Sequence, residues 1–127
     1  MSKKILIVDD DPQVLQTAAE LLRRDGFEVV TYKEKLNRLN FIAQERPDLV
    51  LLDVNMPFLS GDELLRLLKG YPVLRDIPVL FFSSNDERDL RLMVLETGAA
   101  GYVSKSELGG NFAARIAREL ERIERSA

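Results

Sequence analysis

Several short apolar runs in this sequence end at a side chain that can do chemistry. Runs of this kind, bounded by turn-forming residues, are typical of strands buried in a parallel sheet. In open α/β sheets ligands bind at the carboxyl ends of the strands, so polar side chains in these places are candidates for a functional site. The candidates are Asp9, Asp10, Asp53, Ser83 and Lys105.

The acids among these candidates predict a metal site. If the strand ends meet, three carboxylates crowd together, and at neutral pH such a cluster either shares a proton or holds a cation. A hard divalent ion with oxygen ligands fits best, which favours Mg²⁺. Ser83 would offer a hydroxyl and Lys105 a positive charge to Asp53 from the other side. The set predicts a pocket in which Asp53 attacks phosphorus in line while cations neutralise the phosphoryl oxygens.

The residue types that are missing narrow the chemistry further. The 127 residues include no cysteine and no histidine. Disulfides, thiol nucleophiles, zinc sites and Ser-His or Cys-His catalytic pairs are therefore excluded. The remaining chemistry must use carboxylates, hydroxyls, lysine and a hard metal ion.

Apolar patterns predict the elements that position these side chains. Strands are expected at 4–8, 27–32, 48–52, 77–82 and near 102–103. Helices are marked by apolar residues at helical spacing within Val14–Leu22, Leu36–Ala43, Gly61–Leu68, Leu90–Val94 and Leu108–Ile123. Five strands alternating with five helices predict an α/β fold with a doubly wound five-stranded parallel sheet. The flavodoxin-like strand order 2-1-3-4-5 would bring the loop after Val8 beside the loop after Leu52.

Length and charge limit the class of protein. One domain covering residues 1–127 can close a single core. A net charge of -3 leaves no excess of lysine and arginine for phosphate backbones, so direct binding to nucleic acid is not expected. No stretch has the ~20 apolar residues of a membrane span, and no signal-peptide pattern begins the sequence, so we expect a cytoplasmic protein without a membrane segment.

Each candidate also has an ordinary structural explanation. The acids at 9–11 could cap the first helix, and Asp53 could form the turn after its strand. Ser83 could be a helix N-cap, and Lys105 could be a solvated surface lysine. Taken alone, each of these explanations is the simpler one. Their joint position at the carboxyl ends of four predicted strands favours a shared site.

Five motifs in order make the chain resemble the receiver domain of two-component response regulators over nearly its whole length, and it is similar to the single-domain chemotaxis regulators among them. The motifs are Ile7-Val8-Asp9-Asp10-Asp11, Leu51-Leu52-Asp53-Val54-Asn55-Met56-Pro57 with Gly61 beyond it, Pro78-Val79-Leu80-Phe81-Phe82-Ser83, Gly98-Ala99 and Gly101-Tyr102-Val103-Ser104-Lys105. No effector domain is present, so we expect either a stand-alone regulator or a receiver from a longer chain.

The resemblance implies a phosphoacceptor regulator rather than an enzyme with turnover. Asp53 would take a phosphoryl group from the phosphohistidine of a sensor histidine kinase or a phosphotransfer protein. Mg²⁺ would be held by Asp10, Asp53 and the carbonyl of Asn55, with Asp9 helping through water.

The resemblance also implies how the signal is transmitted. Ser83 and Tyr102 match the family's switch pair, a hydroxyl and a ring that move together when phosphate arrives. The signal would leave through the fourth helix, the fifth strand and the fifth helix, toward a downstream protein target or a missing effector domain. Asn55 and Asn85 would flank the water that slowly hydrolyses the phosphoryl group.

Two residues depart from the family pattern. Ser83 replaces the commoner threonine and keeps the hydroxyl. Ser106 replaces the usual proline after Lys105, and a cis bond before serine costs ~2.5–4 kcal/mol. We therefore predict a trans Lys105–Ser106 peptide, with the ammonium still within reach of Asp53.

Three other functions fit parts of the pattern. A haloacid-dehalogenase-type phosphatase also uses an aspartate after an apolar strand, but it needs a second acid two residues later, where this chain has Asn55. A flavodoxin-like cofactor binder needs hydroxyls and amides in its first loop, where this chain has three acids. A degenerate receiver would act only as a docking module, but none of the acids, the hydroxyl or the lysine is missing here.

Overall fold

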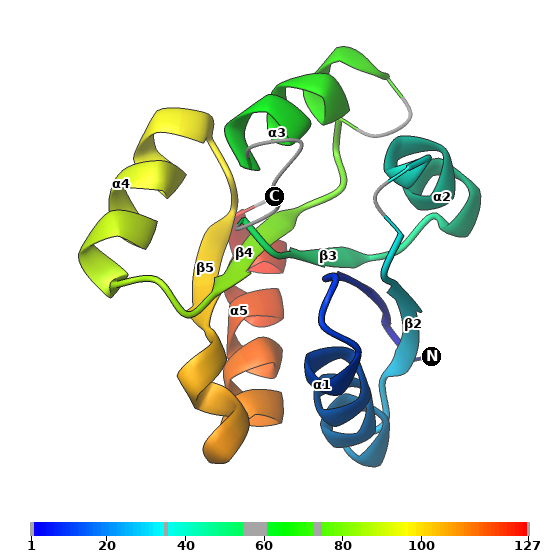
Figure 1. Cartoon of the computed structure of the whole chain (residues 1–127), viewed down its shortest axis with the longest axis vertical. Helices are drawn as coiled ribbons and strands as arrows, with labels where there is room; N and C mark the ends of the chain where they lie inside the picture. Colours follow the sequence, from blue (N-terminus) through cyan, green and yellow to red (C-terminus); the bar gives the residue numbers. More distant parts are fainter. Residues whose placement is uncertain (1, 35, 55–60, 73–74, 127) are drawn as a thin grey trace.

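One parallel sheet runs through the middle of the molecule. A computed structural model of the chain describes residues 2–34, 36–54, 61–72 and 75–126. Within them the sheet has the strand order β2-β1-β3-β4-β5, as predicted (Figure 1). The strands are β1 (Lys4–Val8), β2 (Glu28–Tyr32), β3 (Leu49–Leu52), β4 (Val79–Ser83) and β5 (Gly101–Ser104). Because β1 pairs in parallel with both β2 and β3, the loops after β1 and β3 leave the same edge of the sheet side by side.

Helices cover both faces of this sheet (Figure 1). They are α1 (Pro12–Arg24), α2 (Arg38–Glu45), α3 (Gly61–Gly70), α4 (Glu87–Thr97) and α5 (Phe112–Ser126), with a short 3-10 helix, η1 (Lys105–Gly109), between β5 and α5. Side chains of α1 and α5 pack on one face, and side chains of α2, α3 and α4 pack on the other. Among the helices of the described ranges, none combines the length and the apolar character needed to cross a bilayer.

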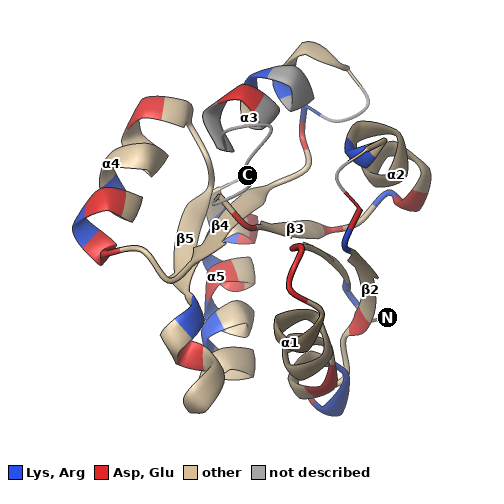
Figure 2. Cartoon of the chain, in the orientation of Figure 1, with Lys and Arg blue, Asp and Glu red and all other residues tan. Residues whose placement is uncertain are grey.

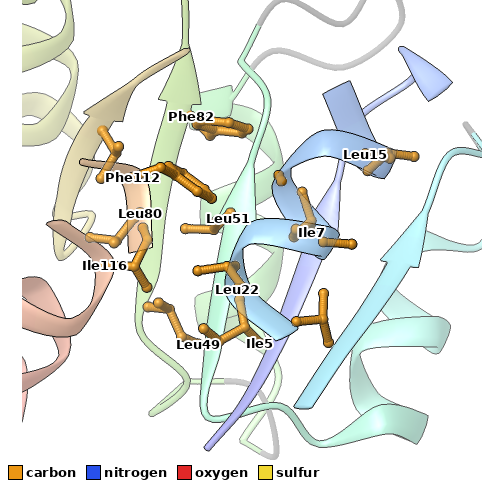
Figure 3. Close-up of a cluster of buried hydrophobic side chains, with 14 of the residues drawn as sticks. Ile5, Ile7, Leu15, Leu22, Leu49, Leu51, Leu80, Phe82, Phe112 and Ile116 are labelled. Carbon is orange, nitrogen blue, oxygen red and sulfur yellow. The ribbon is translucent and has the colours of Figure 1, made fainter. Parts of the chain in front are cut away.

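The core consists of two apolar layers separated by the sheet. Along β1, Ile5 and Ile7 belong to the layer under α1 and α5, whereas Leu6 and Val8 belong to the opposite layer. Figure 3 shows the first layer, in which Phe82 of β4 lies against Phe112 of α5 with 5.4 Å between ring centroids. Burial on both faces explains why the strands read as continuous apolar runs rather than as alternating ones.

The structure corrects two helix boundaries expected from the sequence. Leu36 lies before α2, and 77% of its surface is exposed, because Asn37 takes a left-handed conformation (φ 64°) and α2 begins after it. Leu108 lies in η1 rather than in α5, since η1 ends at Gly109 and the next residue, Gly110, lies between the two helices. Glycine is a poor helix former, so a glycine pair at this point ends one helix before the next begins.

Candidate functional site

The acids of the predicted site are held by the backbone of the sheet. The N–H of Asp9 donates to the carbonyl of Tyr32 (3.1 Å), and the N–H of Asp53 donates to the carbonyl of Val8 (3.0 Å). Both acids therefore continue the hydrogen-bond ladder one residue beyond the apolar strands. Figure 2 shows the acidic loop after β1 and the acidic end of β3 close together at this edge.

Three carboxylates converge there into a cluster that suits a hard cation. One carboxylate oxygen from each of Asp9, Asp10 and Asp53 lies within 4.8 Å of the others. Asp9 is fully buried and Asp53 is 3% exposed, whereas Asp10 is exposed to solvent. Oδ1 of Asp9 accepts the N–H of Asp11 (2.9 Å), but its buried Oδ2 accepts no hydrogen bond of good geometry. A donor set of carboxylate oxygens open to water on one side fits Mg²⁺, which keeps part of its water shell.

Lys105 supplies a positive charge to this cluster. Its Nζ lies 2.8 Å from Oδ2 of Asp9 and 3.6 Å from Oδ2 of Asp53, with 18% of the side chain exposed. The same Nζ lies 5.7 Å from the centroid of the Phe82 ring, which covers it on the core side. Burial opposes the charge, but the carboxylates of Asp9 and Asp53 outweigh burial and raise the pKa of the Lys105 ammonium above its ordinary value.

The loop that carries Lys105 has the predicted trans geometry. The described residues include no cis peptide bond, so Lys105–Ser106 is trans. Ser104 caps the turn that follows it: its hydroxyl accepts the N–H of Ser106 (3.2 Å) and lies 2.8 Å from the Ser106 hydroxyl. These contacts start η1 directly after β5 and leave the Lys105 side chain directed at the acids.

Ser83 is the fully buried last residue of β4. It pairs in register with Ser104, so it lies at the same sheet edge as Lys105. Its hydroxyl accepts the N–H of Asn85 (3.1 Å), which fixes the first turn of the loop toward α4. Tyr102 lies on β5, partly buried, and the guanidinium carbon of Arg115 on α5 lies 6.0 Å from the centroid of its ring.

The structure confirms helix capping for one of the acids at 9–11, and it does not describe one predicted metal ligand. Asp11 has the ordinary structural role, because its side chain caps α1 by accepting the N–H of Gln13 (3.0 Å) and, at longer range, that of Val14 (3.4 Å). Asn55, predicted as a metal ligand through its carbonyl, lies outside the described residues.

The sequence interpretation missed Arg38. This residue is only 5% exposed, although it is an arginine at the start of α2. Its Nε donates to the carbonyl of Glu34 (2.9 Å), and its Nη2 is buried without a hydrogen-bond partner. One signal was available: Arg38 precedes the apolar Ile42 by four residues, so both lie on the same face of the helix.

The fold and the site define a class of protein: a doubly wound α/β domain with a lysine-flanked acidic pocket at the carboxyl edge of its sheet. Residues 5–117 match the family model of the response regulator receiver domain. The chain therefore belongs to the response-regulator receiver family, and it is a phosphoacceptor domain rather than an enzyme with turnover.

Known proteins of this family resemble the chain along most of its length. It is 33% identical over 123 residues to the phosphate regulon transcriptional regulatory protein PhoB of Klebsiella pneumoniae, covering 97% of this chain and 54% of that protein. It is 36% identical over 121 residues to the transcriptional regulatory protein PrrA of Mycobacterium bovis, covering 95% of this chain and 51% of that protein. The chain thus spans about half the length of these curated relatives.

Solved structures show the same fold. The BeF3-activated N-terminal receiver domain of Klebsiella pneumoniae RstA is similar with a TM-score of 0.79 and 33% identity, covering 92% of this chain and 97% of that chain. The chemotaxis protein CheY4 of Vibrio cholerae, at 24% identity, shares the fold with a TM-score of 0.80, covering 97% of this chain and 99% of that chain.

Proposed function

We propose that Asp53 is the phosphoacceptor of this receiver domain. The observation that carries the proposal is its position: Asp53 ends the central strand between the acids of the β1 loop and the ammonium of Lys105, 3.6 Å away. An Asp53 oxygen attacks phosphorus as the P–N bond of a phosphohistidine breaks. The bonding electron pair stays with the imidazole nitrogen, which takes up a proton. Lys105 neutralises charge on the phosphoryl oxygens as they move toward Asp53.

The metal of this reaction would be Mg²⁺. Asp9, Asp10 and Asp53 would hold it together with the carbonyl of Asn55, since hard cations prefer such oxygen donors. When bound, Mg²⁺ supplies the positive charge that lets a dianionic group approach three carboxylates. The residues of the chain do the rest: Asp53 is the nucleophile, Lys105 neutralises charge and Ser83 donates its hydroxyl to a phosphoryl oxygen.

Ser83 and Tyr102 would convert phosphorylation into a change of surface. In the structure the Ser83 hydroxyl accepts the N–H of Asn85, which lies in the loop toward α4. If this hydroxyl turned toward the phosphoryl group, it would pull on that loop. Tyr102 borders a surface hollow of about 380 Å³ between α4 and α5, which Leu95 and Arg115 also line. Movement of the ring would therefore reshape the face of α4, β5 and α5, and a packing change of this kind biases a two-state element by ~1–3 kcal/mol.

The partners follow from this role. A sensor histidine kinase or a phosphotransfer protein would donate the phosphoryl group in the cytoplasm. The α4-β5-α5 face would then contact a downstream protein or an effector domain. Residues 1–127 would form one receiver domain, and the transcriptional regulators to which the chain is similar are about twice as long.

Labelling with a small phosphodonor tests the acceptor. The protein is incubated with acetyl phosphate and MgCl₂, and its intact mass is expected to show one added phosphoryl group. Labelling should disappear in Asp53→Asn and in the wild type treated with EDTA. Asp11→Asn is a matched control, since asparagine also caps helices and Asp11 is outside the acidic cluster. Equal labelling of Asp53→Asn, or labelling that EDTA leaves unchanged, would refute the assignment.

A further inference from the structure

Arg38 is the one buried cation among the described residues. The other buried polar side chains there are Asp9, Asp53 and Ser83, and all three belong to the site described above. A buried arginine is rare unless it is paired, since arginine is one of the residues least often found inside a protein. The position of Arg38 therefore needs a physical reason.

Its hydrogen bonds do not supply that reason. Nε donates to the carbonyl of Glu34, but Nη2 is buried with no acceptor. A buried donor without a partner is unfavourable, and more so when it is charged. Burial lowers the pKa of the guanidinium, while the negative charges of Asp10 and then Asp53 act in the opposite direction and raise it. Burial has the larger effect on the pKa of Arg38, and the negative charges of the site acids oppose it only in part.

The sheet order places Arg38 on the side of the acids that is opposite to Lys105. The acids follow the inner strands β1 and β3, whereas Arg38 follows the edge strand β2 and Lys105 follows the edge strand β5. A surface hollow of about 720 Å³ is lined by Asp10 and by residues 32–34, 36 and 37, the segment onto which the Arg38 side chain folds back. Lys105 pairs with Asp9 and Asp53. The acidic cluster thus follows the inner strands, with Lys105 beyond the edge strand β5 and Arg38 beyond the loop that leaves the edge strand β2.

We propose that Arg38 is a positioning residue of the phosphorylation site: a fixed second cation that weakens Mg²⁺ binding before phosphorylation and stabilises the phosphoryl group afterwards. This inference rests on the proposed function. The phosphorylated, Mg²⁺-bound pocket would contain two carboxylates, a dianionic phosphoryl group, Mg²⁺ and the cations Arg38 and Lys105, and these charges cancel. Without Arg38 the same state keeps one uncompensated negative charge in a partly buried pocket, which is unfavourable.

Mg²⁺ affinity gives the first test. Isothermal titration calorimetry with MgCl₂ is done on the wild type, on the neutral variants Arg38→Met and Arg38→Gln, and on Arg38→Lys. The neutral variants should bind Mg²⁺ about three- to tenfold more tightly, because a cation that repels the metal is gone, and the difference should shrink in high salt. Arg38→Lys should stay near the wild type. Arg24→Met removes the same charge from the exposed end of α1 and should change nothing.

The affinity for beryllofluoride gives the second test, and here the neutral variants should bind more weakly rather than more tightly. BeF3⁻ bound at Asp53 in saturating MgCl₂ carries the charge of the phosphoryl group, so the neutral variants should bind it about three- to tenfold more weakly. If Arg38 had a purely structural role, its neutral variants would bind both Mg²⁺ and BeF3⁻ more weakly, or would bind both as the wild type does. Either result would overturn the inference. Equal behaviour of Arg38→Lys and Arg38→Met would overturn it too. A wild type that binds neither Mg²⁺ nor BeF3⁻ would instead overturn the proposed function. Urea unfolding confirms that each variant is folded.

Discussion

The ammonium of Lys105 lies closer to Asp9 than to Asp53, at 2.8 Å from one carboxylate and 3.6 Å from the other. The lysine pairs with both carboxylates, and its shorter contact is to the acid that is not the proposed phosphoacceptor. A metal that binds Asp9 competes with the lysine for that carboxylate. Binding of the metal would therefore free the ammonium to move toward Asp53, where the phosphoryl group arrives.

Removal of the Lys105 charge should slow phosphorylation. We expect Lys105→Met to take up a phosphoryl group from acetyl phosphate at least about tenfold more slowly, because a charge that stabilises the transferring oxygens is lost. Intact mass measured over time gives the rate. Lys3→Met removes a surface lysine paired with Glu124 and should react like the wild type. A normal rate in Lys105→Met would mean that the ammonium only balances Asp9.

The raised pKa of Lys105 predicts how stability depends on pH. A group whose pKa is higher in the folded state stabilises the fold fully below its unfolded value, about 10.4, and loses this effect as the pH rises through the folded value. The wild type should therefore exceed Lys105→Met in unfolding free energy by about 1–3 kcal/mol from pH 6 to 9, and by less above pH 10.4. Urea unfolding followed by circular dichroism measures both proteins. A difference that grows above pH 10.4 would contradict the pairing.

Repulsion among the acids should lower the stability of the metal-free protein. In EDTA we expect Asp53→Asn to be more stable than the wild type by about 0.5–2 kcal/mol, because one of three crowded charges is removed. MgCl₂ should raise the Tm of the wild type by mass action and raise that of Asp53→Asn less. Differential scanning calorimetry measures both effects, with Asp11→Asn as the control. The cluster would not be a metal site if both proteins responded equally to MgCl₂.

Ser83 should couple the site to Tyr102 without being needed for labelling. Ser83→Ala removes the acceptor of the Asn85 N–H and should cost about 0.5–1.5 kcal/mol of stability. The protein should still become phosphorylated, but the NMR shifts of the Tyr102 ring should no longer respond to BeF3⁻. The neighbouring Ser84 is exposed, so Ser84→Ala should respond like the wild type. If the Tyr102 ring still responded fully to BeF3⁻ in Ser83→Ala, Ser83 would not couple the site to Tyr102.

The sheet and its acids could be predicted from sequence because their signals are local. A run such as residues 49–52 is apolar on both faces, which is typical of a buried parallel strand, and the acid after such a strand lies at the carboxyl edge of the sheet. The start of α2 could not be found in this way, because a left-handed turn at Asn37 overrides the apolar spacing that included Leu36.

The charges around the acids were harder to predict. The spacing from Ile42 indicates that Arg38 lies on the buried face of α2, but no local pattern relates that position to the acids, because they follow other strands of the sheet. The preference of Lys105 for Asp9 over Asp53 rests on a difference of less than one ångström between two contacts. Such differences are decided by packing, which residue patterns do not encode.

The backbone amides of Asp9 and Asp53 can also report the separation of the strands of the sheet. Both amides donate to a neighbouring strand, to Tyr32 of β2 and to Val8 of β1, and neither bond involves the carboxylate of its residue. Amides in such a place exchange with deuterium only when the strands separate. Deuterium uptake at these two positions would therefore report the opening of the sheet itself, and side-chain substitutions at either acid would leave that reporter in place.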